Sequence, residues 1–483
     1  MIDLRPVGYV IGLLVAFLGG SMLVPMALDL AMGNGHAGVF FETAIVSVLI
    51  GMFLALSCAN SVEGGIGTRQ TFILTTGVWV VLPLVGALPF LRGATEAGFT
   101  DAYFEAMSGL TTTGSTVFTG LDALPEGLLL WRSMLQWFGG IGIIIVAMVF
   151  LPELRVGGMQ IFRSEGFDTD GKVLPRAAQI ASRISIVYLG LTVACGFAYF
   201  LAGMTLFDAI NHAFTTIATG GFSTHDTSFG FFQGAPEYIA TVFMILASLP
   251  FVRYVQLLAG SSTPLYRDSQ VRTFLVLLLV FILGMTLFRV IVSGDVILPA
   301  FREALFNLTS IITGTGYAST DYQLWGAFPV TVFFLMGLIG GCAGSTSCSV
   351  KVFRYQLLVG AVANQIRRIH SPHGVFQLKY EGRTVTEDVI SSVMAFLTMF
   401  VVTLGVVSVL LSATGLDFVT SISGAATAIA NVGPGLGPII GPSGNFGDLN
   451  DPAKWILTFA MLVGRLELMV VFVLFTSRFW RSY

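Results

Sequence analysis

Four segments rich in threonine and glycine recur along the sequence, and their backbone carbonyl groups have the chemistry needed to bind a dehydrated cation. The segments read DAYFEAMSGLTTTGST (101–116), DAINHAFTTIATGGFS (208–223), EALFNLTSIITGTGYA (303–318) and TSISGAATAIANVGPG (420–435). In each of them a glycine follows the first residue by thirteen places, and these glycines are Gly114, Gly221, Gly316 and Gly433. Glycine permits backbone torsions that aim successive oxygens toward one axis, where they can replace the water around a cation.

The repetition carries this inference, because a single TTTG sequence is common. Self-similarity at intervals of roughly a hundred residues indicates a repeated structural unit. We therefore predict a cation filter that is built from all four loops. Its expected ligands are Thr112, Thr113, Gly114, Thr219, Gly220, Gly221, Thr315, Gly316, Asn431, Val432 and Gly433.

The composition places these loops in a membrane. The 483 residues are 55% hydrophobic and only 11% charged, which is too apolar for a soluble globular protein. A net charge of −3 provides no basic surface for nucleic acid, so no nucleic-acid partner is expected. The cysteines show no paired metal-ligand spacing, which favours buried thiols; they are Cys58, Cys195, Cys342 and Cys348.

Apolar stretches long enough to cross a bilayer as helices, about 20 residues each, flank every loop. We predict an all-α polytopic membrane protein with ten transmembrane helices, in which an N-terminal helix pair precedes four span–pore-loop–span repeats in pseudo-fourfold arrangement. Irregular backbone at membrane depth must be buried in protein or line water, so the four loops should surround one axis. The expected spans are 7–33, 38–60, 72–93, 128–154, 181–203, 238–260, 273–294, 329–367, 389–415 and 453–480. The expected units are the helix pair 1–71, repeat 1 at 72–180, repeat 2 at 181–272, repeat 3 at 273–388 and repeat 4 at 389–483.

The distribution of basic residues orients the chain. Most of the 24 Lys and Arg residues fall on the side of the termini: Arg5, Arg69, Arg155, Arg163, Lys172, Arg176, Arg183, Arg267, Arg272, Lys351, Arg354, Arg367, Arg368, Lys379, Arg383, Arg478 and Arg481. The opposite side receives Arg92, Arg132, Arg289, Arg302 and Lys454. By the positive-inside rule, both termini are expected in the cytoplasm and the loops enter from outside.

The repeated unit and several motifs resemble the Trk/Ktr/HKT superfamily of potassium transporters over essentially the whole chain. The motifs are TTTGST, GGFSTHD, NVGPGLG, GGCAGST and GRLE, and the extra N-terminal pair is most similar to the membrane subunit of bacterial Trk uptake systems. The resemblance implies potassium ion uptake across the bacterial inner membrane by a homodimer that has one pore in each protomer. It also implies a TrkA-like, nucleotide-binding regulatory subunit on the cytoplasmic face.

The same resemblance bears on selectivity. The sodium-favouring branch of the superfamily carries serine at the position of Gly114, so glycine in all four loops favours potassium. A Ktr- or HKT-like transporter of sodium or mixed cations is the alternative. The sequence leaves open whether transport is channel-like or a symport coupled to protons or sodium.

A run of small residues, GGCAGSTSCS at 340–349, interrupts the apolar stretch 329–367. Such residues have low helix propensity, so we expect either a break into two helices or a kink with close backbone packing. The resemblance implies a flexible gate beneath the filter, made by Gly340, Gly341, Cys342, Ala343, Gly344, Ser345, Thr346 and Ser347. The family usually continues with glycines where Ser347, Cys348 and Ser349 stand, which suggests a stiffer gate in this chain.

Arg465 falls in the middle of the last apolar stretch, where a charge costs about 2.5–3.5 kcal/mol on insertion scales. Residues two apart on a helix face different directions, so a pair with Glu467 is not expected. Arg465 then either pairs with another helix or, as the resemblance to the family's GRLE arginine implies, faces the pore below the filter. Arg253 either reaches the cytoplasmic interface or lines the inner vestibule.

Further polar residues have two interpretations each. Asp226 and Asp321 follow a filter glycine by five places, where they either attract cations or cap turns. A basic cluster either contacts lipid headgroups or docks the regulatory subunit; it contains Arg367, Arg368, His370 and His373. No Walker motif is present, so a nucleotide would act through a partner, and no nucleophile stands beside a base as a membrane enzyme would need.

Overall fold

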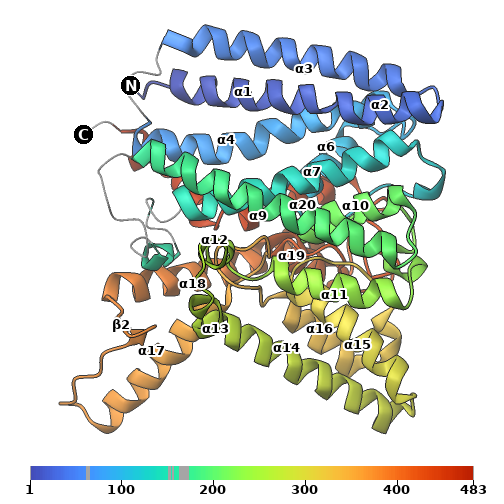
Figure 1. Ribbon diagram of the computed structural model, residues 1–483. Coiled ribbons are helices and arrows are strands. Elements are labelled where there is room, and N and C mark those ends of the chain that lie inside the picture. The colour runs from blue at the N-terminus through green and yellow to red at the C-terminus, as the bar shows by residue number, and fades with distance from the viewer. Residues whose placement is uncertain (1, 61–65, 151–153, 155–156, 163–172, 482–483) are drawn as a thin grey trace.

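The computed structural model describes residues 2–60, 66–150, 154, 157–162 and 173–481, and it is mostly helical (Figure 1). Of the basic residues that orient the chain, Arg155, Arg163 and Lys172 lie outside the described residues, as does the side chain of Arg176. Within the described part, 7 helical stretches are long and apolar enough to cross a membrane, or 8 if one bent pair counts as a span.

These seven stretches coincide closely with seven of the ten expected spans. They are α1 (Arg5–Ser21) with α2 (Leu23–Met32), α3 (Ala37–Cys58), α4 (Thr68–Gly86) with α5 (Leu88–Arg92), α7 (Glu126–Ile145), α9 (Val173–Leu201), α14 (Ser269–Phe288) and α18 (Glu387–Ala413). Single π-turns, η3 (Val146–Phe150) and η6 (Arg289–Ser293), extend α7 and α14. Helices α1 and α3 approach closely, because a Cβ built on Gly12 would lie 2.6 Å from the amide nitrogen of Ala55. Small residues at such contacts are the usual device for packing helices in membranes.

A short helix precedes each threonine–glycine segment. These helices are α6 (Phe99–Leu110), α10 (Leu206–Ile217), α15 (Ile297–Ile312) and α19 (Phe418–Ala430), all too short to cross a bilayer. Two of them begin at side-chain caps, since Thr205 accepts a hydrogen bond from the amide of Asp208, and Asp417 accepts one from that of Thr420. The helices are buried along most of their length, so they stand inside the bundle and not at its surface.

The expected span 238–260 is not one continuous helix. It consists of α11 (Ala235–Ala247) and α12 (Phe251–Leu258), which meet at an angle of 89°. Pro250 stands between them and has no amide hydrogen to continue the helix.

The expected interruption of 329–367 is present. Helix α16 (Ala327–Gly337) ends before the small-residue segment, and α17 (Val352–His370) begins after it. The two segment ends are joined by a parallel bridge between Ile339 and Val350, so the intervening chain forms a closed loop.

The last expected span, 453–480, is also broken, so the placement of Arg465 in mid-helix is wrong. Helix α20 (Asp451–Arg465) ends at the arginine itself, and α21 (Met469–Leu474) and α22 (Ser477–Trp480) follow. The chain turns through Glu467 and Leu468, whose φ angles of 62° and 39° cannot belong to a right-handed helix.

Short elements complete the described chain. They are η2 (Leu121–Ala123), η4 (Met159–Phe162), η5 (Ser228–Phe231), α13 (Thr263–Arg267), η7 (Tyr322–Trp325), and the antiparallel strands β1 (Lys379–Tyr380) and β2 (Arg383–Thr384).

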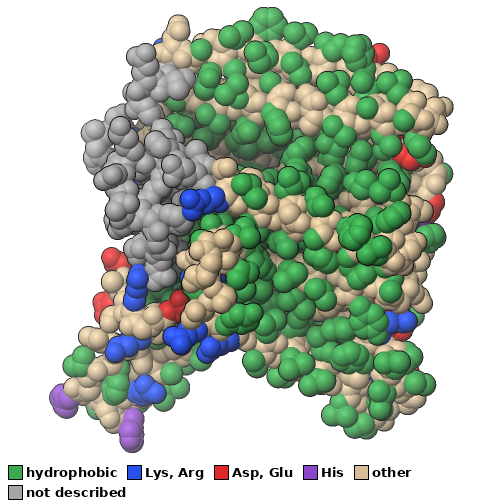
Figure 2. Space-filling view, viewed as in Figure 1, with side chains coloured by type: hydrophobic (Ala, Val, Ile, Leu, Met, Phe, Trp, Pro, Cys, Tyr) green, Lys and Arg blue, Asp and Glu red, His purple; other side chains and the backbone are tan. Residues whose placement is uncertain are grey.

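In Figure 1 the long helices run roughly side by side, with α1, α3 and α4 along one edge and α14 along the other. Both termini lie at the same end of the bundle, and α17 projects away from the body toward that end. Hydrophobic side chains cover most of the visible body, whereas Lys and Arg gather around the base of α17 (Figure 2). This surface is that of a membrane protein, apolar around the bundle and charged at one end.

Candidate functional site

Each short helix ends in the same backbone corner, two residues before the filter glycine. The residues at this corner have positive φ angles: Thr112 (52°), Thr219 (49°), Gly314 (78°) and Asn431 (51°). In the first loop the next amide, that of Thr113, donates to the carbonyl of Ser108 at 2.9 Å, as in a Schellman motif. The amides of Gly220 and Val432 make the equivalent bonds to Thr215 and Thr427.

Two of these corners are strained, and no pattern in the sequence marks them. A left-handed conformation is a genuine outlier for a β-branched residue, yet Thr112 and Thr219 both adopt it. Such strain costs of the order of 1–3 kcal/mol and is concentrated at functional sites. Because Gly114, Gly221 and Gly316 also have positive φ, the sign of φ alternates along these three loops.

The filter glycines lie against one another's loops. A Cβ built on Gly114 would overlap the carbonyl oxygen of Gly220, and one on Gly221 would overlap that of Thr315. A Cβ on Gly316 would lie 2.8 Å from the amide nitrogen of Gly433, and one on Gly433 would lie 3.1 Å from the carbonyl carbon of Gly114. The contacts therefore link the loops in the order first, second, third, fourth and back to the first.

Side chains also join the first and fourth loops. The Asn431 amide donates to the Thr113 hydroxyl at 3.0 Å, and Ser115 donates to the carbonyl of Gly433 at 2.9 Å. Gly433 lacks the positive φ of the other three glycines and precedes Pro434. The backbone and contacts of the fourth loop thus differ from those of the other three.

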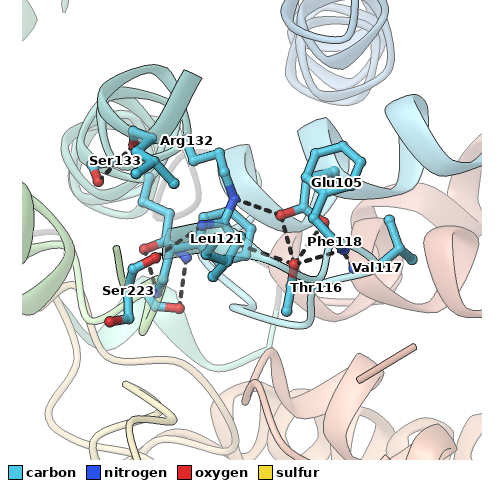
Figure 3. A network of polar contacts seen from close by, with 12 residues as sticks. Glu105, Thr116, Val117, Phe118, Leu121, Arg132, Ser133 and Ser223 are labelled. Atoms are coloured by element: carbon cyan, nitrogen blue, oxygen red, sulfur yellow. Dashed lines mark hydrogen bonds and ion pairs between the residues drawn. The ribbon is translucent and has the colours of Figure 1, made fainter. Parts of the chain in front are cut away.

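A buried ion pair stands behind the first loop (Figure 3). Arg132, on α7, donates from Nε to Glu105, on α6, at 2.8 Å, and their side chains are 1% and 0% exposed. Charge counting assigned Arg132 to the side opposite the termini, and the structure adds that its guanidinium is enclosed by the protein. It also lies 4.2 Å from the centroid of the Phe222 ring.

The small-residue segment 340–349 lies next to the corners of the loops. The Thr112 hydroxyl is 3.6 Å from the sulfur of Cys348, and a Cβ built on Gly314 would lie 3.1 Å from the Cys348 Cβ. The amide of Ser349 donates to the carbonyl of Ala430, at the end of α19, at 2.9 Å. Segment 340–349 is therefore in contact, through Cys348 and Ser349, with the first, third and fourth repeats.

Hydrogen bonds hold this segment in a defined conformation. The amide of Gly341 donates to Ser347 Oγ at 2.8 Å, and that of Ala343 donates to Gln270 Oε1 at 2.8 Å. The amide of Cys342 donates to the carbonyl of Ser248 at 3.0 Å, which lies at the bend between α11 and α12. That bend, which sequence analysis missed although Pro250 was a visible signal, exposes the backbone groups that dock the segment.

Arg465 contacts the same segment. Its Nη1 atom donates to Cys348 Sγ at 2.6 Å and its Nη2 atom to the carbonyl of Gly139 at 3.5 Å. A cavity of about 30 Å³, enough for about one water molecule, is lined by Arg465, Lys351 and Glu467 among others. Glu467 forms an ion pair with Arg354 and not with Arg465.

Arg253 is partly exposed, with 17% of its side chain accessible. It forms ion pairs with Asp268 at 2.8 Å and with Glu381 at 3.5 Å. Arg253 is thus an ion-paired residue at the start of α12.

The two outer aspartates have structural partners. Asp226 accepts a hydrogen bond from the amide of Leu121 at 3.1 Å, and Asp321 accepts one from Gln323 at 3.0 Å, at the start of η7. Turn and cap roles are thus present at both positions.

A histidine connects two outer loops. His225 forms ion pairs with Asp122 and, at 3.5 Å, with Asp208. Burial lowers the pKa of His225, but its bonds to the two carboxylates outweigh burial and raise this pKa above 6.5. The hydrogen bond from His225 in turn lowers the pKa of Asp122.

An apolar helical bundle that encloses a ring of carbonyl-bearing loops is the architecture of a membrane transport protein. The chain belongs to the TrkH family of cation transport proteins, whose sequence profile matches residues 36–482. It is similar to the Trk system potassium uptake protein TrkI of Halomonas elongata, with 42% identity over 99% of this chain and 97% of the relative. It is also similar to the Trk system potassium uptake protein TrkH of Escherichia coli (strain K12), with 37% identity over 99% of both chains.

A solved structure agrees with these relatives. The crystal structure of the potassium transporter TrkH from Vibrio parahaemolyticus matches with a TM-score of 0.92 and 35% identity, over 99% of this chain and 100% of that chain. The resemblance inferred from the sequence motifs is therefore confirmed. The chain is a multi-pass membrane protein of a transport family and not an enzyme.

Proposed function

We propose that this chain takes up potassium across the bacterial inner membrane through a pore that lies within the single polypeptide. The observation that carries the proposal is the closed series of contacts among Gly114, Gly221, Gly316 and Gly433. The names of the relatives, which are potassium uptake proteins, support potassium as the cation.

The proposed filter uses backbone carbonyls and threonine hydroxyls as ligands for the dehydrated ion. The alternating φ angles in three loops support this role. The proposed ligands are Thr112, Thr113, Gly114, Thr219, Gly220, Gly221, Thr315, Gly316, Asn431, Val432 and Gly433.

The proposed architecture has ten membrane crossings in an N-terminal pair and four repeats. It counts the bent α11–α12 pair, the interrupted α16–α17 pair and the broken α20–α22 stretch as one crossing each. The proposed units remain 1–71, 72–180, 181–272, 273–388 and 389–483, with both termini in the cytoplasm.

We assign segment 340–349 as the gate beneath the filter, from Gly340 to Ser349. Its contacts with Thr112, Gly314 and Ala430 support this position, because movement of the segment would disturb the loop corners. Deleting Gly344–Ser349 should raise flux, and unchanged flux would contradict the assignment.

We assign Arg465 as a fixed positive charge that discourages cations from resting below the filter. Its burial and its position on the cavity beside Cys348 and Asn431 support this role. A cation in this cavity would meet the guanidinium at short range in a medium of low dielectric constant.

The proposed assembly is a homodimer that binds a TrkA-like nucleotide-binding subunit on the cytoplasmic face. Helix α17 supports this arrangement, because it projects from the bundle at the end that carries the termini (Figure 1). The docking surface is formed by exposed basic residues at the end of this helix and just beyond it; they are Arg367, Arg368, His370 and His373.

The test is uptake of rubidium, potassium, sodium and lithium into liposomes that contain the purified protein. We expect rubidium and potassium to enter and sodium and lithium to enter poorly. Comparable sodium and potassium fluxes would overturn the proposal in favour of a Ktr- or HKT-like transporter of sodium or mixed cations. Reversal potentials with opposing proton and sodium gradients separate a channel from a symporter.

A further inference from the structure

The buried pair of Glu105 and Arg132 is bonded to the backbone that leaves the filter (Figure 3). The amide of Val117 donates to Glu105 Oε2 at 2.9 Å, and the Thr116 hydroxyl donates to Glu105 Oε1 at 2.9 Å. Arg132 Nη2 donates to the Thr116 hydroxyl at 3.1 Å, and its Nη1 atom donates to the carbonyl of Ser223 at 2.9 Å.

The partners of Glu105 and Arg132 lie directly after two of the filter glycines in the chain. Thr116 and Val117 follow Gly114 by two and three residues, and Ser223 follows Gly221 by two. The pair therefore connects the segment that follows Gly114 in the first loop to the segment that follows Gly221 in the second. A buried ion pair is costly unless hydrogen bonds satisfy its remaining atoms, and here the filter backbone provides those bonds.

In each of the other repeats, an uncharged residue of the short helix is hydrogen-bonded to the segment that follows the filter glycine. His212 Nε2 is 3.0 Å from Ser223 Oγ, which is the residue whose carbonyl Arg132 binds. In the third repeat the amide of Ser319 donates to Asn307 at 3.1 Å, and in the fourth that of Leu436 donates to Ser423 at 3.0 Å.

The four residues, Glu105, His212, Asn307 and Ser423, stand nine or ten places before their filter glycines, so they form one recurring tie. Of these four residues, Glu105 is the charged one, and its partner Arg132 bonds the segments that follow the glycines of two loops.

We propose that Glu105 and Arg132 are positioning residues that set the discrimination between potassium and sodium by fixing the spacing of the first two loops. This inference rests on the proposed filter function. Selectivity depends on the number and placement of the coordinating carbonyls, and sodium, being smaller, requires the oxygens to move inward. A guanidinium that is held by a carboxylate and bonded to both loops resists that movement, because neither group can shift without leaving a buried atom unpaired.

The test compares Glu105→Gln and Arg132→Lys with wild type in the liposome assay, using the ratio of rubidium to sodium uptake as the readout. Glu105→Gln keeps the shape of the side chain but loses its charge. Arg132→Lys keeps the charge but loses the guanidinium, which donates from three nitrogen atoms. We expect the ratio to fall by about tenfold in both, since each change leaves buried polar atoms unsatisfied. A ratio that stays at the wild-type value while both fluxes fall together would overturn the proposal and leave only a structural role.

Two further proteins keep the test decisive. The double variant Glu105→Gln/Arg132→Gln removes both charges, which restores a neutral interior if a single change prevents folding, and its ratio should still be low. Glu303→Gln is the matched control, because it breaks an ion pair with Arg289, at 2.6 Å, on the short helix of the third repeat. Its ratio should equal that of wild type, and an equal fall in this control would also overturn the proposal.

The selectivity of the wild-type protein distinguishes failure of the proposed filter from failure of the proposed role of Glu105 and Arg132. Wild-type protein that admits sodium as well as rubidium contradicts the proposed filter itself. Selective wild-type protein with selective variants contradicts only the role of the pair.

Discussion

Arg465 donates a hydrogen bond to the sulfur of Cys348 at 2.6 Å, which joins the end of α20 to the segment beneath the loop corners. The same sulfur lies 3.6 Å from the Thr112 hydroxyl, so one side chain connects the arginine, the segment and the first loop. These contacts lead to predictions that concern the gate, the charge beneath the filter, the filter glycine and the outer loops.

Replacing Cys348 with glycine should raise potassium flux by about two- to tenfold, because the loss of one hydrogen bond of about 0.5–1.5 kcal/mol frees the segment to move. Rubidium uptake into liposomes measures the effect. Cys342→Ala is the control, since it alters a thiol of the same segment whose backbone amide keeps its bond to Ser248. Lower or unchanged flux in Cys348→Gly would show that Cys348 does not restrain the gate.

Replacing Arg465 with glutamine should also raise flux, because a buried positive charge no longer repels cations in the cavity. The gains from Arg465→Gln and Cys348→Gly should not add in the double variant, since the residues share one hydrogen bond. Single-channel current or rubidium uptake measures this. Fully additive gains would mean that the two residues act separately.

Replacing Gly114 with serine should lower the ratio of rubidium to sodium uptake and destabilise the protein by more than the about 1–2 kcal/mol that a left-handed conformation with a Cβ costs by itself. Gly114 has a φ of 86°, and its added Cβ would overlap the carbonyl oxygen of Gly220. Gly120→Ser is the control, because Gly120 also has positive φ, at 69°, but open space around it. The control should lose stability and keep its selectivity. Equal loss of selectivity in both variants would show that the overlap with the Gly220 carbonyl does not determine selectivity.

The bridge made by His225 should give the outer loops a pH-dependent stability. The pKa of His225 is raised, so its contribution is fully present below pH 6.5 and is lost as the pH rises through the raised value. The pKa of Asp122 is lowered, so the contribution also falls when the pH drops through that lowered value. The difference in melting temperature between wild type and His225→Gln should therefore be largest in mildly acidic buffer and shrink toward pH 9. A difference that stays constant from pH 5 to pH 9 would contradict this bridge.

Local features of the sequence determined much of this protein. The apolar stretches, the recurring Gly114-type segments and the interruption at 340–349 were all predictable, because hydropathy and helix propensity act within a few residues. The family was also recognisable from its motifs.

The partners of the buried charges were decided by tertiary structure. Glu105 meets Arg132 across 27 residues of sequence, and Arg354 meets Glu467 across 113. Charge counting did not show that Arg132 is buried, and hydropathy carried one helix straight through Arg465, because neither method uses the positions of residues that are distant in the sequence. A buried charge persists only where folding brings it a partner, and that choice is made by the packing of the helices and not by the neighbouring residues.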